Sequence, residues 1–231
     1  YMPDVFAIIS VAASMIAMIF LGQMFILLLY ALWLPRVHYK GQWIIKPTWS
    51  IFFPAAIIIY SLASTLWSVH YNLTLRAGLQ FASVICCSLI ISRIVRINAL
   101  IKGITLGVCI ALVVVIISEG GIQTEYALTG SLGSKNQVGA NAEIGFYCAL
   151  MCWFMFKEYL AKILIALPAM ILCGGALFLS QSATSIVSLF AMILISYSAY
   201  ILVIFPKKFR ILVLIAGIFF AASSITTAMR R

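Results

Sequence analysis

A polar stretch at residues 130–139 carries the side chains of this sequence that are best suited to binding an anion. It reads Gly-Ser-Leu-Gly-Ser-Lys-Asn-Gln-Val-Gly and lies between two long apolar segments. Its glycines let the backbone turn tightly, and backbone amides in such a turn, followed by a helix N-terminus, form a natural anion site. The spacing differs from that of a P-loop, so we expect no nucleotide there. The candidate contacts are Gly133, Ser134, Lys135, Asn136 and Gly139.

Glu143 is a carboxylate deep in the apolar segment that follows this stretch. An ionised group at mid-membrane costs about 2.5–3.5 kcal/mol on insertion scales, so it needs a partner or a water-filled cavity. Two interpretations stay open. Glu143 and Asn141 line a functional cavity, or Glu143 forms a structural pair with Asn141 or Lys135.

A second motif-like stretch covers residues 66–76 and combines an interfacial tryptophan with Thr74 and Arg76. Thr74 is expected to cap the next helix, and Arg76 either snorkels or points into a cavity and holds an anion. His70 is either an external base or polar filler. Neither His70 nor His38 has a carboxylate or cysteine at ligand spacing, so no metal site is assigned.

A third polar turn, at residues 179–185, is rich in hydroxyl groups and precedes a long apolar segment. Ser182 or Thr184 is expected to cap the helix that begins there, because both are favoured N-cap residue types. Lining of a polar cavity is the alternative role for these two side chains.

Composition identifies the setting of these turns. The chain has 231 residues, of which 65% are hydrophobic and 9% charged, whereas soluble domains carry about 25% charged residues. The apolar residues form continuous runs of about twenty, the length of a membrane-spanning helix. We therefore expect an all-α, polytopic transmembrane bundle that forms a single integral membrane domain over residues 1–231. The net charge of +10 comes from scattered loop residues, so nucleic acid is not an expected partner.

The apolar runs predict eight spans if the first run is a single helix. That first run has thirty residues, so it is one tilted helix or two helices divided near residues 22–23. The predicted spans are Val5–Leu34, Ile51–Val69, Ala77–Ser92, Gly103–Ser118, Val138–Phe156, Tyr159–Leu179, Ala183–Phe205 and Ile211–Ala228.

Most of the 15 lysines and arginines fall in one set of alternate loops. The positive-inside rule assigns that set to the cytoplasm. The opposite set carries Arg76, Lys135 and the last two arginines, so the three polar turns described above are expected to share the external side.

The order of the three motifs resembles the O-antigen ligase superfamily, and its exopolysaccharide-production branch most closely. The resemblance covers residues 50–205 and departs from the family at Tyr71, where proline is common. It is carried by Trp67-Ser-Val followed by Thr74-Leu-Arg76, by Gly133-Ser-Lys135-Asn136-x-x-Gly139, and by Leu179-Ser-x-Ser182-Ala-Thr184.

The resemblance implies a bacterial inner-membrane ligase or polymerase of surface polysaccharide biosynthesis. Such enzymes take a glycan from undecaprenyl-pyrophosphate on the periplasmic face and transfer it to lipid A–core, in lipopolysaccharide, or to a polysaccharide acceptor. They use no nucleotide sugar, metal or other cofactor. Arg76 and Lys135 match family motifs, so the resemblance implies that they position pyrophosphate or glycan.

Family members are usually longer, with a large periplasmic loop and later helices that carry the residues credited with the chemistry. We therefore expect this chain to be the N-terminal portion of such a fold, with its catalytic residues beyond Arg231, and to be inactive alone. A secondary transporter with a broken-helix site at 130–139 is the main alternative, although no second such segment is found. A non-catalytic membrane scaffold is the third.

Overall fold

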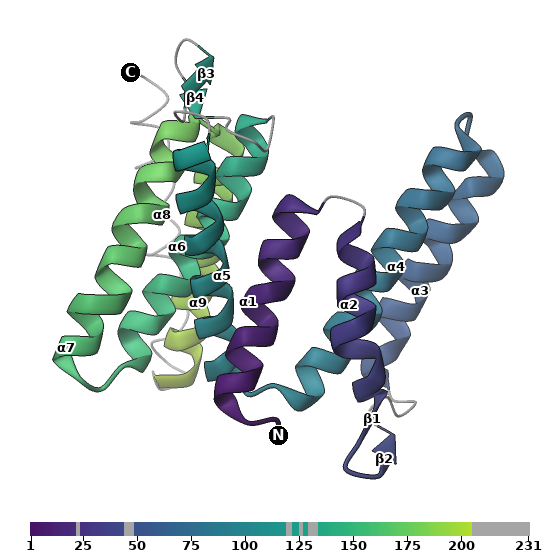
Figure 1. The fold of residues 1–231 in the computed structure, drawn as a ribbon, viewed down its shortest axis with the longest axis horizontal. Helices are drawn as coiled ribbons and strands as arrows, with labels where there is room; N and C mark the ends of the chain where they lie inside the picture. Colours follow the sequence, from purple (N-terminus) through teal and green to yellow (C-terminus); the bar gives the residue numbers. More distant parts are fainter. Residues whose placement is uncertain (22–23, 44–48, 119–121, 125–126, 129–133, 205–231) are drawn as a thin grey trace.

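A computed structural model describes residues 1–21, 24–43, 49–118, 122–124, 127–128 and 134–204. It is built of helices that run alternately up and down, as Figure 1 shows, so the predicted all-α class is confirmed. Two short antiparallel hairpins join some of these helices: β1 (His38–Tyr39) with β2 (Gln42–Trp43), and β3 (Ile122–Thr124) with β4 (Ala127–Leu128). The helices are α1 (Asp4–Phe20), α2 (Phe25–Trp33), η2 (Leu34–Val37), α3 (Trp49–Ala63), η3 (Ser64–Trp67), α4 (Tyr71–Ile94), α5 (Ile97–Ser118), α6 (Lys135–Met155), α7 (Tyr159–Ala161), η5 (Lys162–Ala166), α8 (Leu167–Ser180) and α9 (Ala183–Ile204).

Among the described residues, 5 helices are long and apolar enough to cross a membrane: α4, α5, α6, the continuous segment 159–180, and α9. The chain is thus a multi-pass membrane protein. The spans predicted at Ala77–Ser92 and Gly103–Ser118 begin earlier than expected, at Tyr71 and Ile97. The first turns of these two helices contain polar residues, so hydropathy alone does not show that the helices begin there. The predicted span Ile211–Ala228 lies outside the described residues.

The first apolar run forms two antiparallel helices, α1 and α2, so the single tilted helix is the wrong alternative. The hairpin is closed by a buried hydrogen bond in which Trp33 Nε1 donates to Ser14 Oγ at 2.9 Å. The backbone N–H of Met2 donates to the carbonyl of Ile94 at 2.9 Å and holds the N-terminus beside the end of α4. As a result, the N-terminus lies at the same end of the molecule as β1 and β2 (Figure 1).

Helix α1 packs closely on α5 because α5 presents glycines to it. A Cβ atom built on Gly103 would lie 2.8 Å from Val11 Cβ, and one built on Gly107 would lie 2.9 Å from the Ala12 carbonyl oxygen. Two apolar clusters flank this contact. One gathers residues of α1, α2 and α4, and the other gathers residues of α5, α6, α8 and α9.

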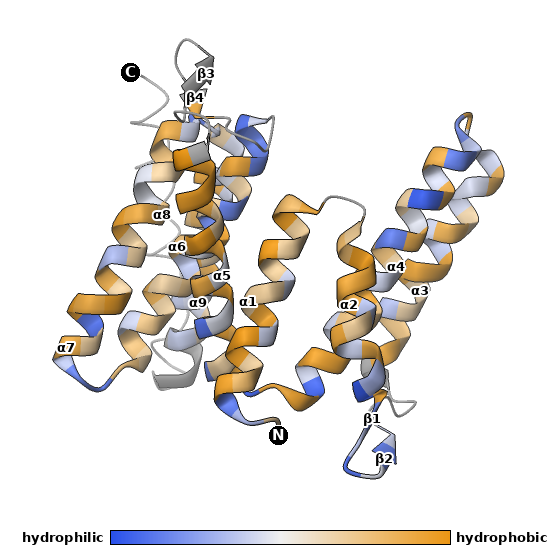
Figure 2. Ribbon diagram, viewed as in Figure 1, coloured by the Kyte–Doolittle hydropathy of each residue, from blue (hydrophilic) through white to orange (hydrophobic). Residues whose placement is uncertain are grey.

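The two ends of the molecule differ in charge. The basic end carries β1–β2 and the α4–α5 and α6–α7 turns, with cations that include Arg36, Arg96, Lys102 and Lys157. The motif end carries the η3–α4 turn, β3–β4 and the α8–α9 turn (Figure 1). Figure 2 shows hydrophobic colour along the middle of most helices and hydrophilic colour at both ends and along the first turns of α4 and α6. The three polar turns therefore share one end, as the loop charges predict.

Candidate functional site

Helix α6 begins at Lys135 because Ser134 adopts an extended backbone, with φ −145° and ψ 128°, immediately before it. The Ser134 carbonyl accepts the N–H groups of Gln137 and Val138 at 3.1 and 3.2 Å, while its hydroxyl makes no capping bond. Lys135 therefore occupies the first helical position, where its side chain is exposed, and the first turn holds no acidic residue. A cation here opposes the helix dipole, whose positive end favours an anion. The first turn of α6 therefore concentrates positive potential, and none of the described residues supplies a counter-charge to it.

Gly139 lies inside α6, at the point where this helix meets the α8–α9 turn. A Cβ atom there would lie 2.6 Å from Ser182 Cβ and 2.7 Å from Ser185 Oγ. Its role is to allow this close approach, so the expected role in a tight turn is wrong for Gly139. Gly133, the other glycine assigned to the site, lies outside the described residues.

A network of hydroxyl groups fills this contact. Ser182 is 1% exposed, and its Oγ donates to Asn136 Oδ1 at 3.3 Å. The same oxygen lies 3.1 Å from Thr184 Oγ1 and 3.0 Å from Ser185 Oγ. The structure thus brings Asn136 and Gly139 of one predicted motif together with Ser182 and Thr184 of another.

Ser182 also begins α9, although its hydroxyl is not the capping group that the sequence predicts. Its backbone carbonyl accepts the N–H of Ile186 at 3.1 Å, which is the first bond of the helix. The turn before it depends on Gln181, whose left-handed backbone (φ 49°) ends α8. Ser180 and Ser185 complete the hydroxyl lining and were missed as site residues. Their signal is the spacing of serines at 180, 182 and 185, which places hydroxyls on both sides of one turn.

Glu143 lies one turn beyond Gly139, so Asn136, Gly139 and Glu143 occupy one face of α6. The Glu143 residue is 9% exposed, and within the described part of the chain its carboxylate has no hydrogen-bond or ion-pair partner. Asn141 instead donates from Nδ2 to the Gln137 carbonyl at 2.9 Å. Lys135 is exposed and forms no ion pair with Glu143. The predicted structural pair is therefore wrong, and the cavity interpretation stays a prediction.

Arg76 lies on α4, in a hairpin with α3 that is separate from α6. Helix α4 begins at Tyr71, and Thr74 is already inside it, so the expected Thr74 cap is wrong. The Thr74 hydroxyl instead lies 2.5 Å from Ser68 Oγ and closes the turn between η3 and α4. Arg76 is exposed. Figure 1 shows this hairpin on the far side of α1 and α2 from α6, α8 and α9, so Arg76 and Lys135 share an end but not a cluster.

Comparison with known proteins adds one relative. The chain is 30% identical over 197 residues to the exopolysaccharide production protein ExoQ of Rhizobium meliloti (strain 1021). The match covers 82% of this chain and 45% of the relative, so the chain spans less than half the length of that protein. No protein-family model matches the sequence, and no solved structure matches the chain. The resemblance drawn from the three motifs is confirmed by this relative.

Proposed function

Because this chain belongs to the ExoQ-like, O-antigen-ligase-like family, we propose that it takes part in exopolysaccharide production at the bacterial inner membrane. In this proposal the motif end faces the periplasm and binds a glycan carried on undecaprenyl-pyrophosphate. The glycan is passed to a polysaccharide acceptor or to lipid A–core, with release of the lipid pyrophosphate. The name of the relative favours the polysaccharide acceptor.

The observation that carries this proposal is the position of Lys135 at the first residue of α6. A cation at that position destabilises the helix by about 0.3–1 kcal/mol unless an anion lies beside it. The departing pyrophosphate is such an anion, and the exposed amine and the N–H groups of the first turn are suited to bind it. Fixed donors and cations of this kind stabilise the charge that develops on a leaving group.

The hydroxyl network supports the same proposal by fixing the site. Asn136 Oδ1 accepts a hydrogen bond from Ser182 at 3.3 Å, which links the first turn of α6 to the turn that precedes α9. Ser134, Asn136 and Thr184 present polar groups suited to hydrogen-bond sugar hydroxyls. Glu143, buried one turn further along the same face of α6, is proposed to line the deep wall of the same site.

Arg76 is proposed to contact a more distant part of the ligand. It lies at the motif end on another hairpin, and a lipid-linked glycan is large enough to contact both regions. Its contribution is therefore expected to be smaller than that of Lys135.

Charge reversal at Lys135 tests the proposal. The variant is produced in a strain from which the gene for this protein has been deleted. We expect Lys135→Glu to lower exopolysaccharide output at least about 100-fold, the effect of removing a fixed transition-state charge. Lys135→Arg is expected to keep most of the output. Accumulation of the undecaprenyl-linked glycan should accompany the loss.

Lys157→Glu is the matched control, because Lys157 is also an exposed lysine but lies at the basic end. It should leave output unchanged at equal protein levels. Normal output from Lys135→Glu would remove the proposed site. Loss of uptake of a solute, with normal polysaccharide, would favour a transporter, and loss of a partner protein from the membrane complex would favour a scaffold.

A further inference from the structure

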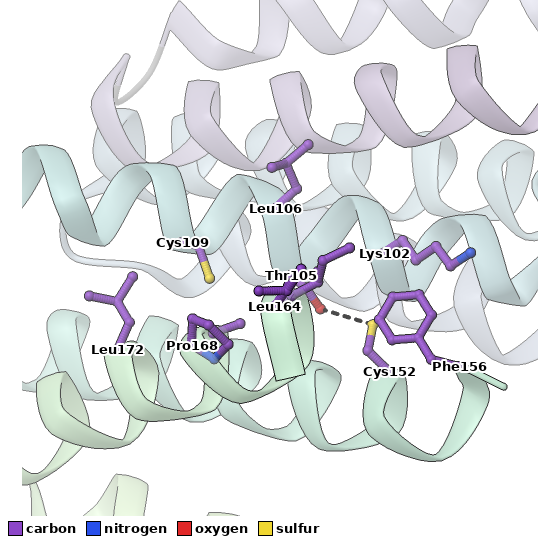
Figure 3. A pocket seen from close by; sticks show the side chains of 11 residues that line it. Lys102, Thr105, Leu106, Cys109, Cys152, Phe156, Leu164, Pro168 and Leu172 are labelled. Carbon is purple, nitrogen blue, oxygen red and sulfur yellow. Dashed lines mark hydrogen bonds between the residues drawn. The ribbon is translucent and has the colours of Figure 1, made fainter. Parts of the chain in front are cut away.

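A groove of about 300 Å³ lies between α5, α6 and the segment that joins η5 to α8. Figure 3 shows its lining side chains, which are mostly apolar. Part of its lining, Lys102 of α5 and Phe156 at the end of α6, belongs to the basic end of the molecule, away from the hydroxyl network at the motif end. The lining residues are Lys102, Thr105, Leu106, Cys109, Cys152, Phe156, Leu164, Ile165, Pro168, Ala169 and Leu172.

The groove is polar at one end only. Lys102 and Phe156 lie together at one end, whereas Cys109 and Leu172 lie at the opposite end (Figure 3). The distance from Lys102 to Cys109 along α5 is about 10 Å at 1.5 Å per residue. A ligand that matches this lining is a long apolar chain with a charged group at one end.

The polar atoms inside the groove are already used. Thr105 Oγ1 donates to the carbonyl of Ile101 at 2.9 Å, and it lies 3.7 Å from Cys152 Sγ (Figure 3). Hydroxyl and thiol groups that are bonded to the protein give a hydrogen-bonding ligand little to bind. An alkyl chain therefore fits the walls better than a sugar or a peptide backbone.

Lys102 sets the charge of the ligand. Its amine lies 5.2 Å from the centre of the Phe156 ring, and no carboxylate of the described residues pairs with it. A second lysine on this side, Lys162, lies 5.8 Å from the Trp153 ring. Lysines beside aromatic rings at the end of membrane-spanning helices are typical of the membrane interface. An anion at the depth of the lipid headgroups would complement the positive charge at this end of the groove.

The sequence explains why the groove stays open. Residues Lys162–Ala166 form a π-helical turn, in which the Leu167 N–H donates to the carbonyl of Lys162. Helix α8 begins directly afterwards at Leu167, and Pro168 in its first turn has no N–H to donate, which suits a break in the α-helical hydrogen-bond pattern at this point. The extra residue in the turn widens the helix. This widened turn carries Leu164 and Ile165, which form one wall of the groove together with Pro168 of α8.

We propose that the groove binds one acyl chain of an anionic phospholipid of the bilayer, with the lipid phosphate against Lys102. Basic sites between membrane-spanning helices, on the side with the positive loops, recognise such headgroups. The bound lipid fills the gap beside the π-helical turn and fixes α8 against α5 and α6. This site is independent of the glycan site, because it lies at the other end of the bundle.

Native mass spectrometry of the purified protein tests the headgroup contact. The protein is incubated with phosphatidylglycerol or phosphatidylcholine of identical acyl chains, and the retained lipid is counted. The unaltered protein is expected to prefer phosphatidylglycerol, and Lys102→Gln to lower that preference about fivefold. Lys157→Gln, which removes an exposed lysine outside the groove, should leave the preference unchanged. Equal effects of the two variants would overturn the proposal.

A second pair of variants tests the acyl chain. Leu172→Trp places a large ring inside the groove, whereas Ile171→Trp places it at the neighbouring position, which is 66% exposed. Leu172→Trp is expected to lower retention of both lipids several-fold, and Ile171→Trp to lower neither. Equal retention in these two variants would contradict an occupied groove. Selective retention of a polyprenyl phosphate over both phospholipids would also overturn the proposal.

Discussion

The two motif-bearing regions at the same end of the molecule are held in different ways. In the α3–α4 hairpin, the hydroxyl contact between Ser68 and Thr74 joins residues 6 positions apart. At the junction of α6 with α9, the bond from Ser182 to Asn136 joins residues 46 positions apart. Long-range contacts of the second kind fix a site by the packing of several helices, whereas the first kind closes only a local turn. A binding site needs side chains held by such a supporting shell, which favours Lys135 over Arg76 as the centre of the site.

Glycine substitutions test this difference and should have the largest effect on stability. Gly139→Ala would place a Cβ atom 2.6 Å from Ser182 Cβ, so α6 and α9 must separate. We expect it to lower the free energy of unfolding by about 3 kcal/mol. Gly78→Ala, on α4, would meet the Ser61 carbonyl oxygen at 3.2 Å and is expected to cost less. Thermal unfolding in detergent measures both.

Gly175→Ala is the control for helix propensity, because no atom lies within 4 Å of a Cβ atom there. It should stabilise the protein by about 1 kcal/mol. If Gly139→Ala unfolds at the same temperature as Gly175→Ala, the close approach between α6 and α9 is absent and the two regions are equally loose.

Substitutions of Glu143 are expected to have the next largest effect. They should raise the stability of the protein but lower its exopolysaccharide output. A buried polar group without a partner destabilises the fold by about 1–3 kcal/mol. Glu143→Leu should therefore raise the unfolding temperature, and Glu143→Gln should change it less. Both should reduce exopolysaccharide output if the carboxylate lines the glycan site. A fall in unfolding temperature for both variants would show a structural pair instead.

Ser182→Ala is expected to give the smallest effect. It removes the bond to Asn136 and should lower the free energy of unfolding by about 1 kcal/mol. Ser68→Ala, which removes the local contact to Thr74, is the matched change in the other region. Unfolding should be affected more by Ser182→Ala, and only Ser182→Ala should reduce exopolysaccharide output. A larger effect of Ser68→Ala would reverse the comparison.

Hydropathy and loop charge predict the helical class and the shared end of the three motifs, because both depend on average properties of long segments. They place a possible division of the first apolar run near residues 22–23, where the structure has it, but they do not decide between one tilted helix and two. Phe20 and Phe25 lie on either side of that turn and are as apolar as the helix interiors. The hairpin depends instead on the bond between Trp33 and Ser14, a tertiary contact that no local pattern encodes.

The candidate site shows the same division between local and tertiary information. The start of a helix near Lys135 follows from the polar turn before it. The contact between Gly139 and Ser182 requires knowing that α6 packs on α9, which residue types alone do not specify. For the same reason, the sequence places Arg76 and Lys135 on one side but cannot show that α1 and α2 lie between their helices.

Photo-crosslinking in membranes that make the polysaccharide tests the glycan site most directly. A photoreactive residue is placed at Gln137, which is exposed in the first turn of α6, and separately at Lys157, which is exposed at the basic end. The predicted result is an adduct that carries glycan from position 137, reduced by Lys135→Glu, and none from position 157. A glycan adduct from position 157 and none from position 137 would contradict the site and its side of the membrane.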